Sequence, residues 1–109
     1  MSTKNTQALI VNTGIKLFNE RGARHVSTNR IAEACNLSRG NLHYHFKNKE
    51  SLIQSIFDRM AREIETDWGD DYLQPTAEHM AEMFYRQLMM IWNYRFFYRE
   101  LTPLLQNDP

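Results

Sequence analysis

Two short helical patterns separated by a three-residue break limit the folds open to this chain. The break is Asn36-Leu37-Ser38. Asparagine adopts the left-handed conformation at a helix end more readily than other non-glycine residues, and serine is a strong helix N-cap. We therefore expect one helix to end at Asn36 and another to begin at Ser38, with Leu37 turned inward. Two helices joined by so short a turn are typical of a helix-turn-helix.

The second helix of this pair, residues 38–46, is too short to contribute only core packing. Leu42 and Phe46 lie four residues apart and define its inward side. With 100° between successive residues, Gly40 and Tyr44 then point away from the core. The outward, flanking and amino-terminal positions are Ser38, Arg39, Gly40, Asn41, His43, Tyr44 and His45.

These outward side chains suit the major groove of DNA better than they suit a solvated surface, where lysine and glutamate would be expected. Gly40 allows a close approach of the backbone, Asn41 can pair with an adenine edge, and Arg39 can reach guanine or a phosphate. Tyr44 and His45 can donate to phosphates. We interpret the protein as a sequence-specific binder of double-stranded DNA.

Two candidate phosphate contacts lie outside that helix. Thr28 begins the first helix of the pair, where it can serve as a cap or donate to a phosphate. Lys49 lies in the first turn of the following helix, where the helix dipole disfavours a cation by ~0.3–1 kcal/mol. A nearby phosphate would reverse that penalty. Purely structural roles stay open for all these candidates, as solvated, locally hydrogen-bonded or partly packed side chains.

The formal net charge of zero conceals an asymmetry along the chain. Residues 1–60 hold nine Lys and Arg against four Asp and Glu, a net of +5. Residues 61–109 hold four basic and nine acidic residues, a net of −5. A positive front half and a negative rear half suit one end that faces DNA and one that avoids phosphate.

Other functional classes have little support in the sequence. The one cysteine, Cys35, excludes an internal disulfide framework and fits a buried helical position. We see no signal peptide or membrane-spanning run and expect a cytoplasmic protein without a membrane partner. His43 and His45 lie two apart on a helix, project about 200° apart and cannot share one ion. With no zinc or phosphate-loop motif, we expect no enzyme, metal or cofactor.

A further helix is predicted before the pair, over residues 4–21. Its apolar stripe runs through Ile10, Gly14 and Phe18, and Gly22 ends it. Glycine inside a helix costs ~1 kcal/mol relative to alanine. A close crossing by another helix at Gly14 would be a sufficient reason for that cost.

Two longer helices are predicted after the pair. Asn48 caps the first, and after a break at 69–75 Thr76 caps the second, which Pro103 ends after residue 101. Between residues 80 and 101 apolar groups cover nearly its whole circumference, which is typical of a helix buried among others or in self-association. The fold class is therefore all-α, with a helix-turn-helix DNA-binding domain at 1–47, a connecting helix at 48–68 and a further helical segment at 76–109.

The residues at 14–22, 27–34 and 37–52 closely resemble the TetR family of bacterial transcriptional regulators. Spacing and residue type agree together over residues 8–60, and the likeness is loose from 61 onward. Three positions depart from the usual family pattern: Asn36 stands where glycine is usual, His43 where tyrosine is usual and Gly14 where alanine is usual.

The resemblance implies a homodimeric repressor whose two recognition helices enter successive major grooves of a palindromic operator. It also implies that residues 76–109 are a partial helical ligand-binding or dimerisation domain. In such a domain a small-molecule inducer alters the helix-turn-helix spacing and releases DNA. By the same analogy helix 76–101 would line the inducer pocket, although ordinary core packing explains its apolar residues equally well. An alternative function is a protein-interaction module that docks through the apolar helix 80–101. The candidate residues of the inducer pocket are Met83, Phe84, Leu88 and Trp92.

Overall fold

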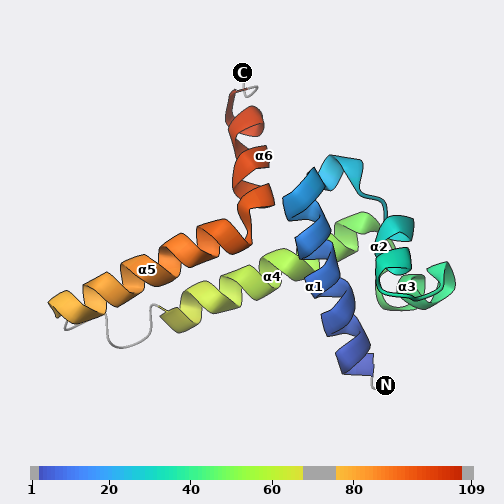
Figure 1. The fold of residues 1–109 in the computed structure, drawn as a ribbon, viewed down its shortest axis with the longest axis horizontal. Helices are drawn as coiled ribbons and strands as arrows, with labels where there is room; N and C mark the ends of the chain where they lie inside the picture. Colours follow the sequence, from blue (N-terminus) through green and yellow to red (C-terminus); the bar gives the residue numbers. More distant parts are fainter. Residues whose placement is uncertain (1–2, 68–75, 107–109) are drawn as a thin grey trace.

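The computed structural model describes residues 3–67 and 76–106 of the chain, which form an arrangement of helices (Figure 1). The prediction of an all-α fold is confirmed for these residues. The predicted break at 69–75 lies outside the described residues. The elements are α1 (Thr3–Arg21), the short 3-10 helix η1 (Ala23–His25), α2 (Thr28–Ala34), α3 (Arg39–His45), α4 (Lys49–Asp67), α5 (Ala77–Asn93) and α6 (Arg95–Gln106).

The core of the first four α-helices forms where α1 crosses α4. Phe18, Ile31 and Leu52 are buried there without solvent exposure. A Cβ atom placed on Gly14 would lie 3.3 Å from Leu52 Cδ2 and 3.8 Å from Ile31 Cδ1. The close helix crossing at Gly14 is therefore confirmed, and it explains why a glycine is tolerated inside α1.

The turn between α2 and α3 has the conformation that Asn36 predicts. Asn36 has a φ angle of 60°, and its N–H donates to the Glu33 carbonyl oxygen at 3.0 Å. The Leu37 N–H donates to the Ala32 carbonyl oxygen at 2.9 Å. These two bonds form a Schellman motif, which satisfies carbonyl groups at the end of α2. The Ser38 hydroxyl then accepts from the Asn41 N–H at 3.0 Å and begins α3.

The helix caps follow the sequence predictions and settle one open choice. Ser27 caps α2, because its hydroxyl oxygen accepts from the Arg30 N–H at 3.1 Å. Thr28 is the first residue of the helix and is not its cap. Asn48 Oδ1 accepts from the Ser51 N–H at 2.8 Å, and Thr76 Oγ1 accepts from the His79 N–H at 3.1 Å.

The prediction of one long helix over residues 76–101 is wrong. The helix divides at Tyr94 into α5 and α6, and α6 continues through Pro103 to Gln106. The division is stabilised by Asn19 of α1, whose side-chain amide donates to the Asn93 carbonyl oxygen at 2.7 Å. The same amide accepts from the Phe96 N–H at 2.9 Å. One side chain thus satisfies the last carbonyl of α5 and an early N–H of α6.

The start of α6 is fixed against the end of α1 by further contacts. The rings of Phe18 and Phe96 lie 5.3 Å apart, and Arg99 Nη2 donates to the Asn19 carbonyl oxygen at 2.6 Å. The Ala23 N–H donates to Glu100 Oε1 at 2.9 Å. In Figure 1 the red α6 accordingly lies beside the end of the blue α1, away from α3.

Helix α5 is not buried on all sides by the described chain, so its burial among other helices or in self-association stays a prediction. Met90 is buried, whereas Phe84 and Trp92 are 67% and 60% exposed. Only one side of α5 faces the rest of the chain described here. The other exposed apolar residues of α5 are Met80, Tyr85, Leu88, Met89 and Ile91.

Asn36 offers a direct test of the turn. Asn36→Gly should leave the free energy of unfolding unchanged within about 1 kcal/mol, because glycine adopts a positive φ without strain. Asn36→Val should lower the free energy of unfolding by at least about 1–2 kcal/mol, because a β-branched residue is strained at that φ. Urea unfolding followed by circular dichroism measures both. Equal stability of the two variants would contradict the proposed role of this residue.

Asn19 offers a test of the junction between α1 and the α5–α6 unit. Asn19→Leu should lower the free energy of unfolding by about 2–4 kcal/mol, because it leaves two backbone groups without their bonds. The control is Asn29→Leu, the same change at an exposed position of α2, which should stay within about 0.5 kcal/mol of the parent. Thermal and urea unfolding compare the two. A loss of the same size in both variants would show that Asn19 has no special role.

Candidate nucleic-acid interface and adjoining cleft

Helix α3 presents to solvent the face that the sequence predicts. Leu42 is 1% exposed and Phe46 is 8% exposed, so the expected inward side is confirmed. Tyr44 is 79% exposed, and a Cβ atom on Gly40 would have no heavy atom within 4 Å. A partner can therefore approach the backbone at Gly40 without obstruction. The other exposed candidates here are Ser38, Arg39, Asn41 and His43.

The two histidines of α3 are placed differently. His43 Nδ1 lies 3.0 Å from the Lys47 carbonyl oxygen, so this nitrogen donates the hydrogen bond. His45 is half-buried, and its Nδ1 is buried without a hydrogen-bond partner. The Tyr44 ring packs edge-on against His45 at 5.1 Å. Tyr44 is thus better placed than His45 to reach an external phosphate.

A basic groove beside α3 gathers side chains from five elements. Its volume is about 660 Å³, and no Asp or Glu is found among the described residues that line it. Three of its lining residues, Thr28, His43 and Lys49, are predicted DNA contacts. The sequence did not predict the remaining lining residues as DNA contacts. The positive charge of the basic residues among them is evident from the sequence. Their gathering in one groove is not, because Arg24 and His25 reach the groove only through the conformation of η1. The lining residues are Arg21, Arg24, His25, Val26, Ser27, Thr28, Arg30, His43, Lys47, Asn48 and Lys49.

Lys49 has a second interaction that its sequence position did not suggest. The residue is half-buried, and Nζ lies 6.0 Å from the centre of the Phe18 ring. A cation over an aromatic face is stabilised by about 0.5–1 kcal/mol where solvent has access. This contact offsets the unfavourable effect of the helix dipole on the charge of Lys49 without a phosphate. In the groove, Lys49 lies among other basic residues.

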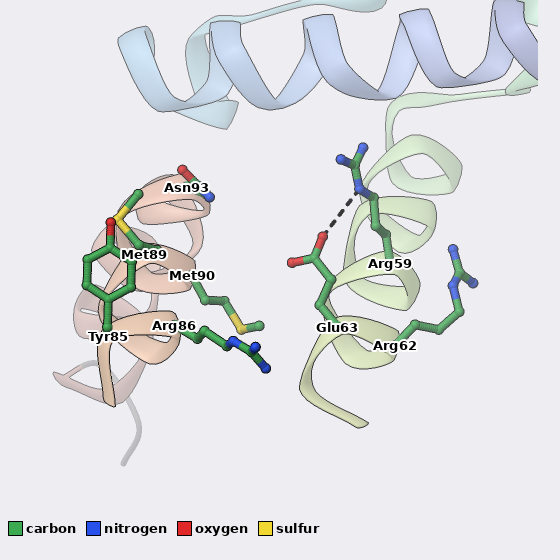
Figure 2. Close-up of a pocket in the computed structure, with 8 residues that line it drawn as sticks. All are labelled: Arg59, Arg62, Glu63, Tyr85, Arg86, Met89, Met90 and Asn93. Atoms are coloured by element: carbon green, nitrogen blue, oxygen red, sulfur yellow. Dashed lines mark ion pairs between the residues drawn. The ribbon is translucent and has the colours of Figure 1, made fainter. Parts of the chain in front are cut away.

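A cleft lies on the other side of the molecule, between α4 and α5 (Figure 2). Its volume is about 520 Å³. The four predicted pocket residues of α5 are not among its lining residues, and three of them, Phe84, Leu88 and Trp92, are exposed elsewhere. A role for these residues in ligand binding stays a prediction. The lining residues are Arg59, Arg62, Glu63, Tyr85, Arg86, Met89, Met90 and Asn93.

Sequence reasoning missed the face of α5 that lines this cleft, although a signal was present. Tyr85 and Met89, and Arg86 and Met90, are pairs four residues apart. Arg86 is also the one charged residue between Met83 and Trp92. A cation in such a stretch indicates the side of the helix that meets polar groups.

A network of polar contacts connects the cleft to α1. Arg59 Nη1 donates to Asn12 Oδ1 of α1, and Arg59 Nε lies 3.6 Å from Glu63 Oε1. The Tyr94 hydroxyl donates to the same Glu63 oxygen at 2.9 Å. Burial, followed by the hydrogen bond and the negative charge of Glu63, raises the pKa of Tyr94 to about 12. The tyrosine therefore stays protonated and keeps its bond at ordinary pH.

The described residues show neither a metal centre nor a membrane segment. No three His, Cys, Asp or Glu residues of the described chain are grouped so that they could hold a metal ion. None of the helices in that same part is both long enough and apolar enough to cross a bilayer.

The geometry at the α2–α3 end defines a class of protein. Two short helices joined by a left-handed turn, an exposed polar face on the second helix and a basic groove beside it constitute a helix-turn-helix domain. Residues 10–56 match the family model described as bacterial regulatory proteins, tetR family. Over these residues the chain therefore matches the TetR family, as the sequence resemblance predicted.

Curated relatives and a solved structure agree with that assignment. The probable HTH-type transcriptional regulator YttP of Bacillus subtilis is 27% identical over 105 residues, which cover 89% of this chain and 51% of that protein. The class G tetracycline repressor protein of Vibrio anguillarum is 31% identical over 64 residues, which cover 59% of this chain and 30% of the repressor. The chain thus spans about half or less of the length of these relatives.

The structural similarity extends over the whole chain. The crystal structure of a TetR-family transcriptional regulator from Marinobacter aquaeolei has a TM-score of 0.82 and 35% sequence identity to this protein. The match covers 100% of this chain and 53% of that one. The arrangement of α4, α5 and α6 behind the helix-turn-helix is therefore also similar to that of a known family member.

The pKa of Tyr94 leads to a prediction about alkaline pH. Because the pKa of Tyr94 in the folded protein, about 12, is above the ordinary tyrosine value of 10.0, its contribution to the free energy of unfolding should be complete below pH 10 and be lost as pH rises through 12. Rapid pH-jump absorbance at 295 nm should show one of the five tyrosines ionising last. Tyr94→Phe should remove that last step, and the control Tyr44→Phe should retain it. A last step that survives in Tyr94→Phe would contradict the assignment.

Proposed function

We propose that this protein is a transcriptional repressor that binds a palindromic operator as a homodimer, with α3 in the major groove. The observation that carries the proposal is the exposed polar face of α3, with open backbone at Gly40 and a solvent-directed Tyr44. A helix held by two buried residues and exposing its polar residues is the usual form of a recognition helix. Such a regulator acts on DNA in the cytoplasm.

The proposed contacts divide into base recognition and phosphate positioning. Arg39 and Asn41, exposed near the start of α3, form hydrogen bonds to base edges, and Gly40 between them allows the approach. Thr28, Lys49 and the basic groove hold the phosphate backbone and fix the orientation of α3. The phosphate contacts of Ser38, His43, Tyr44 and His45 belong to the same proposal.

Ligand control is proposed for the part of the chain behind the helix-turn-helix. We assign residues 1–47 to DNA binding, 48–68 to the connecting helix and 76–109 to a partial ligand-binding or dimerisation domain. Support comes from the hydrogen bonds of Asn19 to the α5–α6 division and of Arg59 to α1. A small-molecule inducer that shifts α4 or α5 would therefore act on helices bonded directly to the DNA-binding core.

A second candidate function is supported by the exposed apolar side of α5. Met80, Phe84 and Trp92 are each at least 60% exposed on that helix. A protein-interaction module would use this side to dock a partner and would need the helix-turn-helix only as a scaffold. Light scattering separates the two functions. A dimer that binds palindromic DNA supports the first, whereas a monomer indifferent to DNA but captured by a protein partner supports the second.

Operator binding provides the main test. Fragments selected from a genomic pool should share a palindrome, and affinity for it should fall by about 10³–10⁵ between 50 and 200 mM salt if 6–10 phosphates are contacted. Arg39→Ala or Asn41→Ala should relax base preference by about 1–3 kcal/mol at one position of each half-site. Lys49→Ala should instead weaken binding to all sequences and reduce the salt dependence.

The matched control for the operator test is Lys16→Ala, which removes an exposed lysine of α1 that does not line the basic groove. Its affinity and salt dependence should equal those of the parent. A salt dependence that is flat for the parent would contradict the proposal. So would a loss of affinity in Arg39→Ala that is the same for every sequence.

A further inference from the structure

The cleft between α4 and α5 has a charged wall and an apolar wall (Figure 2). Arg59, Arg62 and Glu63 of α4 form the charged wall, and α5 contributes Arg86 beside an apolar surface. The described lining residues therefore carry three guanidinium groups against one carboxylate, a net charge of +2. Figure 2 shows Arg86 extending from α5 toward α4, on whose facing side Arg59 and Glu63 lie. The apolar surface of α5 is formed by Tyr85, Met89 and Met90.

The ion pairs on these walls are of the kind that a ligand can displace. Arg86 Nη2 lies 3.1 Å from Oε1 of Glu82, one turn earlier on α5, and the two side chains are 49% and 59% exposed. The Arg59–Glu63 pair is similarly exposed, with 3.6 Å between nitrogen and oxygen. Solvent-exposed pairs of this kind contribute only about 0–1 kcal/mol. An anion entering the cleft can therefore compete for either guanidinium group.

We propose that this cleft binds a small amphipathic carboxylate, with its anion between Arg86 and Arg59 and its apolar body on Tyr85, Met89 and Met90. This inference rests on the ligand control proposed above and specifies the chemical class of the effector. Arginine pairs with carboxylates through two parallel hydrogen bonds, and methionine side chains adapt to varied apolar shapes. The volume of about 520 Å³ is in the range of small-molecule sites.

The same arginine gives the site a connection to the helix-turn-helix. Arg59 Nη1 donates to Asn12 Oδ1, and Asn12 lies on α1 two residues before the crossing at Gly14. A carboxylate that engages Arg59 competes with this bond. Occupancy of the cleft therefore changes the contacts of α1, the helix against which α2 packs.

Binding of defined probes to the whole chain tests the inference. The probes are octanoate and 2-naphthoate, and the controls are their neutral primary amides, measured by isothermal titration and by NMR of the side-chain amides. At least one carboxylate should bind at least about tenfold more tightly than its amide, the equivalent of 1.4 kcal/mol. Binding should shift the Asn12 side-chain amide signal. Arg86→Gln should weaken carboxylate binding by about tenfold or more and leave amide binding unchanged.

The matched control variant is Lys4→Gln, which removes one positive charge from an exposed residue that does not line the cleft. It should bind the carboxylates as the parent does. The inference is overturned if neither carboxylate binds, if the amides bind equally well, or if Arg86→Gln and Lys4→Gln behave alike. None of these measurements uses DNA. A chain that binds carboxylates but no operator would overturn the proposed function and retain this site, and the reverse result would remove the site alone.

Discussion

The helix-turn-helix part and the α5–α6 unit are held together by one central interaction, the pair of hydrogen bonds made by the side-chain amide of Asn19. It donates to the end of α5 and accepts from the start of α6, and it is 7% exposed. A buried amide that satisfies both backbone groups makes the break between the two helices energetically acceptable, since unpaired groups there would each cost about 1–3 kcal/mol. The packing of Phe18 on Phe96 follows from that geometry. Helix α1 consequently belongs to both parts, with the helix-turn-helix on one side and the α5–α6 unit on the other.

The features that the sequence predicted are those determined by neighbouring residues. The left-handed Asn36, the cap at Ser38 and the inward pair of α3 each depend on chemistry within about one helical turn. The crossing at Gly14 was also predictable, because a glycine inside a helix requires a reason in its surroundings. For the candidate DNA-binding face, sequence reasoning identified which residues of α3 are outward, and their contacts with DNA stay a prediction.

The features that the sequence did not predict depend on residues far apart in the chain. Asn19 and Phe96 are 77 positions apart in the sequence, so no residue near Tyr94 predicts that the apolar helix divides there. A helix that is apolar all round has no periodicity to indicate which side faces inward. For that reason the sequence predicts Phe84 and Trp92 as pocket residues, whereas the cleft is lined by another face of α5. The basic groove was missed for a related reason, because its lining residues come from five separate elements.

The distribution of charge explains how a chain of zero net charge can offer two positive sites. The basic groove beside α3 and the cleft between α4 and α5 lie on different sides of the α1–α4 crossing, and each collects more guanidinium and ammonium groups than carboxylates among its described residues. Glu78 lies instead on the exposed part of α5, and Glu82, which pairs with Arg86 at the edge of the cleft, is also exposed. Since interactions between exposed charges are largely screened beyond about 8–10 Å in physiological salt, each site attracts anions according to its own residues. The net charge of the chain therefore says little about either site. In the proposed ligand control, α1, which contacts the walls of both, is the element that connects them.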